Sequence, residues 1–206
     1  MTAGKYDKQA ERWSETAYGD ASAYLAHRAA LVRSLGPPLE RDDSLLDLAC
    51  GDGGLADHLP DTRYTGVDTS PEMVRAGTEH GRNVVLGDLN DYEPLEPVAA
   101  TTCFRAIYYA TDRAAFFRRV AGYTERKFVF DLNPRQYRVD DVRADLRLAG
   151  FDEFELRPFF SPQRFALPRP LVVALHALER SGPLASLLLA VRFSYLCVAF
   201  RGGKKT

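Results

Sequence analysis

The stretch Leu45-Leu46-Asp47-Leu48-Ala49-Cys50-Gly51-Asp52-Gly53-Gly54-Leu55-Ala56 decides the fold. Its apolar run 45–50 is typical of a buried parallel strand. The run ends on glycines, and the apolar spacing over 55–59 predicts the start of a helix. A strand that turns through glycines into a helix lets backbone N–H groups face a ligand. Gly51-x-Gly53-x-x-Ala56 also fits the dinucleotide-binding pattern, which is a weak signal alone.

Two later apolar segments each end on a carboxylate. Residues 64–67 are followed by Asp68, and residues 84–87 are followed by Asp88. Because parallel strands end at one edge of a sheet, both carboxylates are expected beside the glycine turn. An acidic residue at the tip of the second strand is placed to accept both hydroxyls of a ribose.

Three motifs follow one another in order: Asp47-x-x-Cys50-Gly51-x-Gly53, then Gly66-Val67-Asp68-x-Ser70-x-x-Met73, then Gly87-Asp88-Leu89. This series resembles the class I S-adenosylmethionine-dependent methyltransferases of small-molecule type. The resemblance implies an α/β, Rossmann-like, seven-stranded and mostly parallel sheet with an antiparallel last strand and helices on both faces. It also implies S-adenosyl-L-methionine as cofactor and S-adenosyl-L-homocysteine as product.

A chain of 206 residues fits one domain. Apolar residues at helical spacing over 5–35, closed by Gly36-Pro37-Pro38, predict an N-terminal helical cap over 1–38. The cofactor-binding core is expected over 39–160, where strand and helix patterns alternate. A helical insert or lid is expected over 161–191, and the last strand over 192–201.

The resemblance implies a set of cofactor-binding residues. They are Tyr24, Arg28, Asp47, Ala49, Cys50, Gly51, Gly53, Asp68, Thr69, Met73, Gly87, Asp88, Leu89 and Phe104. Several have structural alternatives: Tyr24 beside a solvated Arg28, Asp47 as a buried partner of the glycine turn, and Asp68 as a helix N-cap. Met73 could be simple core. Asp52, at a position that the motif leaves open, is expected to face solvent.

The methyl acceptor is expected near the end of the fourth strand. Phe104 and Arg105 are predicted on that strand, where Arg105 either anchors an anionic or carbonyl group or pairs with Asp131. Tyr108 and Tyr109 either line the acceptor pocket or are rim aromatics, and with Arg105 they are the candidate catalytic residues. No metal-ligand spacing is visible, so no metal is expected.

The expected exposure of each of the four histidines follows from the predicted segment in which it lies. His58 and His80 are expected at the surface, whereas His27 and His176 could face the pocket.

Composition limits the partners. A net charge of −1 argues against a nucleic-acid partner. Three cysteines without a C-x-x-C pair predict buried, reduced thiols and a cytoplasmic protein. Neither apolar stretch in the insert, 171–178 or 184–191, reaches the roughly 20 residues of a transmembrane helix. The region 165–191 could instead form a lid, a homodimer contact or a membrane-surface contact.

These observations predict a methyltransferase that acts on an oxygen or nitrogen atom of a small, hydrophobic or amphipathic acceptor. One alternative is an NAD(P)-dependent oxidoreductase. One observation argues against it: Asp47 precedes the glycines. The other is a non-catalytic, cofactor-binding partner protein, which the intact motifs disfavour.

Overall fold

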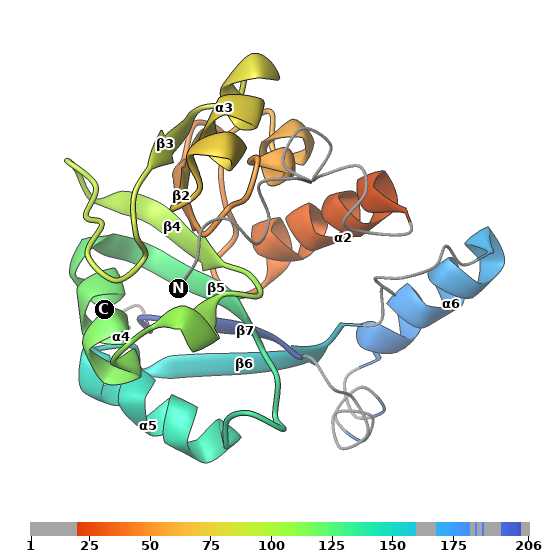
Figure 1. The fold of residues 1–206 in the computed structure, drawn as a ribbon. Coiled ribbons are helices and arrows are strands. Elements are labelled where there is room, and N and C mark those ends of the chain that lie inside the picture. The colour runs from red at the N-terminus through yellow and green to blue at the C-terminus, as the bar shows by residue number, and fades with distance from the viewer. Residues whose placement is uncertain (1–19, 160–167, 182–183, 185–186, 188–194, 203–206) are drawn as a thin grey trace.

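The computed structural model describes residues 20–159, 168–181, 184, 187 and 195–202. Seven strands form one sheet in the order β3-β2-β1-β4-β5-β7-β6 (Figure 1). The strands are β1 (Ser44–Leu48), β2 (Arg63–Asp68), β3 (Val84–Leu86), β4 (Val98–Cys103), β5 (Thr124–Leu132), β6 (Glu153–Pro158) and β7 (Tyr195–Phe200). The helices are α2 (Ala21–Ser34), α3 (Pro71–Glu79), α4 (Arg113–Tyr123), α5 (Val139–Ala149) and α6 (Arg169–Glu179), with two 3-10 turns, η3 (Gly54–His58) and η4 (Ile107–Tyr109).

The strand directions confirm the predicted fold class. Strands β1 to β5 pair in parallel. The last strand, β7, lies between β5 and β6 and is antiparallel to both. The strand order reverses between β1 and β4, and open α/β sheets bind ligands beside such a point.

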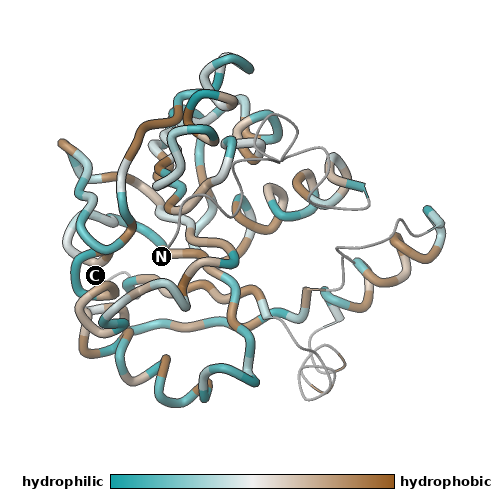
Figure 2. Tube along the Cα trace, viewed as in Figure 1, coloured by the Kyte–Doolittle hydropathy of each residue, from teal (hydrophilic) through white to brown (hydrophobic). Residues whose placement is uncertain are grey.

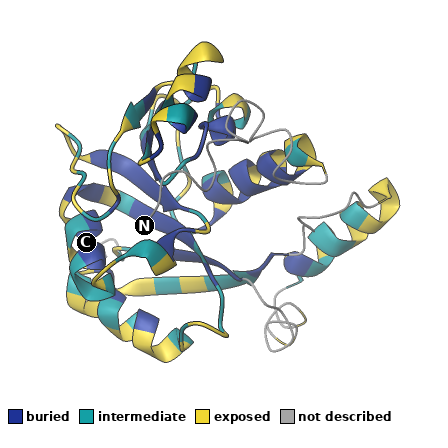
Figure 3. Ribbon diagram, viewed as in Figure 1, coloured by how far each residue is buried: buried dark blue, intermediate teal, exposed yellow. Residues whose placement is uncertain are grey.

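Side chains of the central strands alternate between two hydrophobic cores. Leu46, Phe128 and Phe130 pack with α4 and α5 on one face. Leu45 and Val129 pack with α2 on the other. Because successive side chains of a strand point to opposite faces, strands covered on both faces must be apolar throughout. Figure 3 accordingly shows the central strands as buried.

Capping residues set several helix ends. Ser70 accepts the backbone N–H of Met73 at the start of α3, with Pro71 in its first turn. Asp112 caps α4 through the N–H of Ala115. Gly150 ends α5 in the left-handed conformation, at φ 104°.

Lys127 fastens β5 to the end of α2. Its ammonium is buried and donates to the carbonyl oxygen of Leu35 at 2.7 Å. Burial, reinforced by the neighbouring Arg126, lowers the pKa of Lys127 to about 8. The carbonyls at the end of a helix leave acceptors for such a donor.

Two local predictions were wrong. The segment after the glycine turn is the short 3-10 turn η3 instead of an α-helix. Strand β4 ends at Cys103, so Phe104 and Arg105 lie in the following loop, with Arg105 at φ 56°.

Helix α6 contains the described part of the predicted insert and projects beside the sheet (Figure 1). Hydrophobic residues run along it (Figure 2), and Leu171 and Val173 are exposed. Apart from residues 184 and 187, the second predicted stretch, 184–191, lies outside the described residues, as does 1–19 of the cap. None of the helices in the described ranges has the length and hydropathy to cross a membrane.

Candidate functional site

A cavity of about 740 Å³ opens where β1 to β4 end. All the predicted site residues line it except Tyr24 and Gly53. Tyr24 lies just behind the wall, and Gly53 belongs to the turn that forms it. The lining residues that sequence reasoning missed include Leu25, Ser70, Asn90, Ala106, Ala110 and Thr111.

The glycine turn brings bare backbone to the cavity wall. Gly51 and Gly53 have φ of 63° and 73°, in the left-handed region that favours glycine. A Cβ on Gly53 would lie 2.7 Å from Val84, so the turn also packs against β3. Ala49, beside Gly51, has φ 56°, a conformation that is uncommon for residues other than glycine.

Asp68 lies at the tip of β2, and local backbone fixes its carboxylate. Its oxygens accept the N–H of Gly51 at 2.8 Å and the N–H of Ser70 at 2.9 Å. Burial raises the pKa of Asp68, and these backbone donors oppose the rise. A carboxylate offers about four lone-pair sites, so further acceptor capacity remains for a ligand. Ser70 makes the side-chain N-cap of α3, the role that Asp68 had as its alternative.

Asp88 lies in the loop after β3 and is exposed at the cavity. Asn90 donates to its Oδ1 from both the backbone and the side chain, each at 2.8 Å. The Asn90 side chain also accepts the N–H of Thr111 at 2.9 Å and so joins this loop to the opposite wall. An asparagine two residues after an aspartate in a loop is the sequence signal that could have found it.

Asp47 is buried below the glycine turn. It accepts the Tyr64 hydroxyl at 2.8 Å and the Thr102 hydroxyl at 2.6 Å. Burial raises the pKa of Asp47, and the two hydroxyls oppose that rise. Asp47 is therefore hydrogen-bonded to side chains of the two neighbouring strands, β2 and β4, and it also lines the cavity.

Arg28 is buried, and not solvated as its structural alternative assumed. Its Nη2 donates to the Tyr24 hydroxyl at 2.6 Å and to Asp131 at 3.1 Å. The guanidinium lies over the ring of Phe104, 4.1 Å from the ring centre. A buried arginine therefore presents positive charge to the cavity wall.

Asp131 lies at the end of β5 and contacts two arginines of the predicted site, Arg28 and Arg105. Its ion pair is with Arg28, whereas Arg105 donates its backbone N–H at 2.5 Å. Arg105 is exposed and lines the cavity together with Tyr108 and Tyr109, whose ring centres are 4.2 Å apart. Of the two alternatives for Arg105, the structure shows a contact with Asp131, but through the Arg105 backbone N–H. The anchoring of an acceptor group stays a prediction.

The prediction that Asp52 faces solvent was wrong. Asp52 is 1% exposed and forms an ion pair with Arg82 at 3.0 Å. Arg82 also reaches Asp57 at 2.7 Å. A charge can be buried only when it is paired, and the partner of Asp52 lies 30 residues away, beyond any local pattern.

His27 and His176 do not line the cavity. Their rings stack on each other, with ring centres 3.5 Å apart. His80 is exposed and His58 is half-buried. All three cysteines are free thiols; Cys103 and Cys197 are buried, and Cys50 is half-buried at the cavity.

Comparisons with known proteins agree with this geometry. A family described as "Methyltransferase domain" matches residues 45–126. Trans-aconitate 2-methyltransferase of Mycobacterium tuberculosis is 33% identical over 106 residues, which are 46% of this chain and 40% of the relative. The chain thus matches about two fifths of the length of that curated relative.

Solved structures share the fold. One is a putative methyltransferase in complex with the Trm112 methyltransferase activator of Haloferax volcanii; its TM-score is 0.70 at 20% identity over the full length of both chains. Another is a TehB-like SAM-dependent methyltransferase of Corynebacterium glutamicum, with a TM-score of 0.64 at 14% identity over 98% of this chain and 100% of that one. Its motifs, the domain matched over residues 45–126 and its sheet order make the chain similar to the class I S-adenosylmethionine-dependent methyltransferases.

Proposed function

We propose that this protein transfers a methyl group from S-adenosylmethionine to an oxygen or nitrogen atom of a small acceptor molecule. The observation that carries the proposal is the cavity itself. The glycine turn after β1, Asp68 after β2 and Asp88 after β3 all line it. Open α/β sheets bind nucleotide-like ligands at this edge.

The residues present fit the cofactor. Asp68 would accept the ribose hydroxyls, because its backbone donors fix its orientation and leave acceptor capacity. Asp88 would accept the adenine amino group, with Leu89 donating its backbone N–H, and Met73 would pack beside the base. Arg28 and Asp47 would hold the charged amino-acid end, with the Tyr24 hydroxyl orienting Arg28. When bound, the cofactor supplies an electrophilic methyl group on a sulfonium.

Arg105, Tyr108 and Tyr109 are proposed to hold the acceptor. They line the cavity with Phe104, on the loop between β4 and α4. No described histidine lines this wall, so an acceptor that is already deprotonated suits it best, since such an acceptor needs no general base. The named acid of the M. tuberculosis relative is a substrate of this kind. Arg105 would then pair with the negative charge of the acceptor.

Helix α6 is proposed as part of a contact surface. Its described residues lie outside the cavity lining, while Leu171 and Val173 are exposed. This supports the predicted homodimer or membrane-surface contact over 165–191 more than a wall of the acceptor pocket. The lid role rests on residues outside the described ranges.

The two alternative functions differ from this proposal in measurable ways. An oxidoreductase would bind a nicotinamide cofactor in the same cavity, and a partner protein would bind S-adenosylmethionine without transferring its methyl group. Incubation with S-adenosylmethionine carrying an isotope-labelled methyl group and a metabolite extract, followed by mass spectrometry, separates the three.

We expect a labelled small molecule that is not formed by Asp68→Ala. Arg105→Met should lower the rate while leaving affinity for S-adenosylhomocysteine within a few-fold. Arg138→Met, an exposed arginine at the start of α5 outside the cavity, is the matched control. Absence of any labelled product from a folded protein that binds the cofactor would favour the partner protein.

A further inference from the structure

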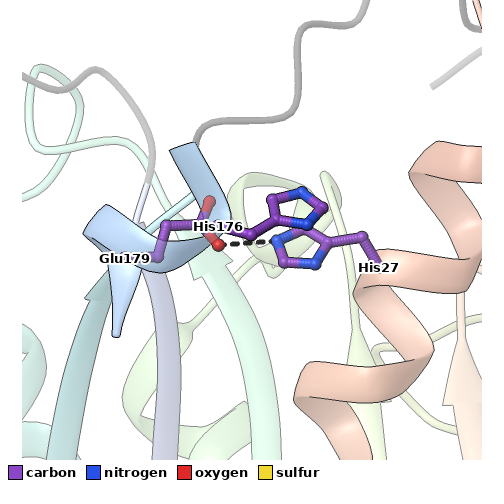
Figure 4. A group of neighbouring side chains, drawn as sticks. All are labelled: His27, His176 and Glu179. Carbon is purple, nitrogen blue, oxygen red and sulfur yellow. Dashed lines mark hydrogen bonds and ion pairs between the residues drawn. The ribbon is translucent and has the colours of Figure 1, made fainter. Parts of the chain in front are cut away.

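Three metal-ligating side chains converge between α2 and α6, away from the cavity (Figure 4). His27 comes from α2, and His176 and Glu179 come from α6. One possible ligand atom from each of the three lies within 4.8 Å of the others. His27 Nε2 and Glu179 Oε2 are 2.7 Å apart.

The helices place these donors on facing surfaces. His176 and Glu179 are three residues apart on α6 and therefore share one face of the helix. His27 faces them from α2, 152 residues before Glu179 in the chain. The imidazole planes of His27 and His176 are inclined by only 8°, so the two rings lie face to face beside the carboxylate (Figure 4).

Two of the three side chains are buried, and His176 is half-buried, which leaves water access to the cluster from that side. The side chains of His27 and Glu179 are 5% and 2% exposed. Phe159 stacks on His27, with ring centres 5.3 Å apart.

We propose that His27, His176 and Glu179 bind one Zn²⁺ ion, with water as the fourth ligand. Two imidazole nitrogens and a carboxylate oxygen are a donor set that zinc takes in proteins. Tetrahedral bonds of about 2.1 Å place donors roughly 3.4 Å apart. Because a ring nitrogen binds a metal in the plane of its ring, one of the two stacked imidazoles turns out of the stack when both bind the same ion. The ion would hold α6 against α2 at the residue before Arg28, which lines the cavity.

The alternative is a metal-free contact in which His27 donates to Glu179 and His176 only stacks. Metal-binding measurements on the full chain distinguish the two. Metal-free protein is titrated with Zn²⁺ and with Co²⁺, and zinc that remains after dialysis is measured by elemental analysis. We expect one equivalent per chain and the visible absorption of four-coordinate cobalt.

Conservative variants test each ligand. His176→Phe keeps an aromatic ring to stack on His27, and Glu179→Gln keeps an oxygen that can accept the imidazole N–H. Each should weaken zinc binding by more than the roughly 10–100-fold loss seen when an outer-shell partner is removed. His58→Ala and His80→Ala are matched controls that should bind zinc as the wild type does. Unchanged affinity in His176→Phe, with its fold verified by circular dichroism, would overturn the proposal.

X-ray absorption on the zinc-loaded wild type provides a test that does not depend on variants that fold. We expect two imidazoles and oxygen ligands around the ion. Sulfur in the first shell would assign the metal to a cysteine instead and would refute the site. Failure of the wild type to retain zinc above the level of Glu179→Gln would refute it equally.

Discussion

The cavity wall and the junction between α2 and α6 are held together over very different distances along the chain. In the wall, Asp68 accepts the N–H of Ser70 and Asp88 that of Asn90, two residues away in each case. At the junction, His27 meets Glu179 across 152 residues. Local turn contacts, together with the N–H of Gly51 on Asp68, orient the wall carboxylates, whereas the junction depends on how the sheet places two distant helices.

The largest loss of stability is expected where the cavity wall depends on a contact between residues far apart in the sequence, Asp52 and Arg82. Arg82→Ala removes the ion pair to the buried carboxylate of Asp52 in the glycine turn. Breaking a buried ion pair on one side costs about 3–5 kcal/mol of unfolding free energy. Chemical denaturation measures it, and Arg75→Ala, which removes exposed pairs on α3, is the control at about 0–1 kcal/mol. Equal losses of unfolding free energy in both variants would show that the Asp52–Arg82 ion pair does not stabilise the fold.

Asp68→Ala tests the local wall itself. The substitution removes the proposed acceptor of both ribose hydroxyls. We expect a loss of about 2–4 kcal/mol in affinity for S-adenosylhomocysteine, since each hydrogen bond to a charged group contributes about 1.5–3 kcal/mol and water compensates in part. Calorimetry measures the loss, with Asp57→Ala, an aspartate outside the cavity lining, as the control. An affinity unchanged from the wild type would place the ribose elsewhere.

The pH dependence of stability tests the burial of Lys127, which joins β5 to the end of α2. Its folded pKa, about 8, lies below the unfolded value of 10.5, so the unfolded chain binds more protons between these values. The cost of burying the charge is therefore full below pH 8 and is relieved as pH rises, by about 2 kcal/mol between pH 8 and 10.

Denaturation at both pH values, compared between wild type and Lys127→Met, isolates this contribution. The wild type should gain stability relative to the variant as the pH rises. Parallel pH curves for the two proteins would show that the ammonium is not buried as described.

The smallest changes in stability are expected at two glycines where an added Cβ would meet no other atom. A Cβ on Gly122 in α4, or on Gly150 after α5, would meet no atom within 4 Å. Gly122→Ala should stabilise the protein by about 0.5–1 kcal/mol, because alanine loses less entropy in a helix. Gly150→Ala should destabilise it by about 1–2 kcal/mol, since its φ of 104° disfavours a side chain. Thermal melting compares the two, and shifts of the same sign would contradict the assigned conformations.

The sequence predicts the wall well because its signals are local. Strands that end on Gly51, Asp68 and Asp88 must bring those residues to one edge of a parallel sheet, whatever else the chain does. Asp52 was misplaced because its partner, Arg82, is set by tertiary packing. Arg105 was placed on a strand because nothing in its neighbours predicts a loop with positive φ.

The junction could not be predicted for the same physical reason. His27 and His176 belong to segments whose separation along the chain hides their stacking. Only the assembled sheet, with β7 between β5 and β6, determines where α6 lies.

The identity of the cofactor can be tested by calorimetry. The wild-type protein is titrated with S-adenosylhomocysteine and, separately, with NADH. We expect S-adenosylhomocysteine to bind at one site with a micromolar Kd, about −8 kcal/mol, and NADH to produce no binding heat. Binding of NADH without binding of S-adenosylhomocysteine would contradict this expectation and assign the cavity to a nicotinamide cofactor.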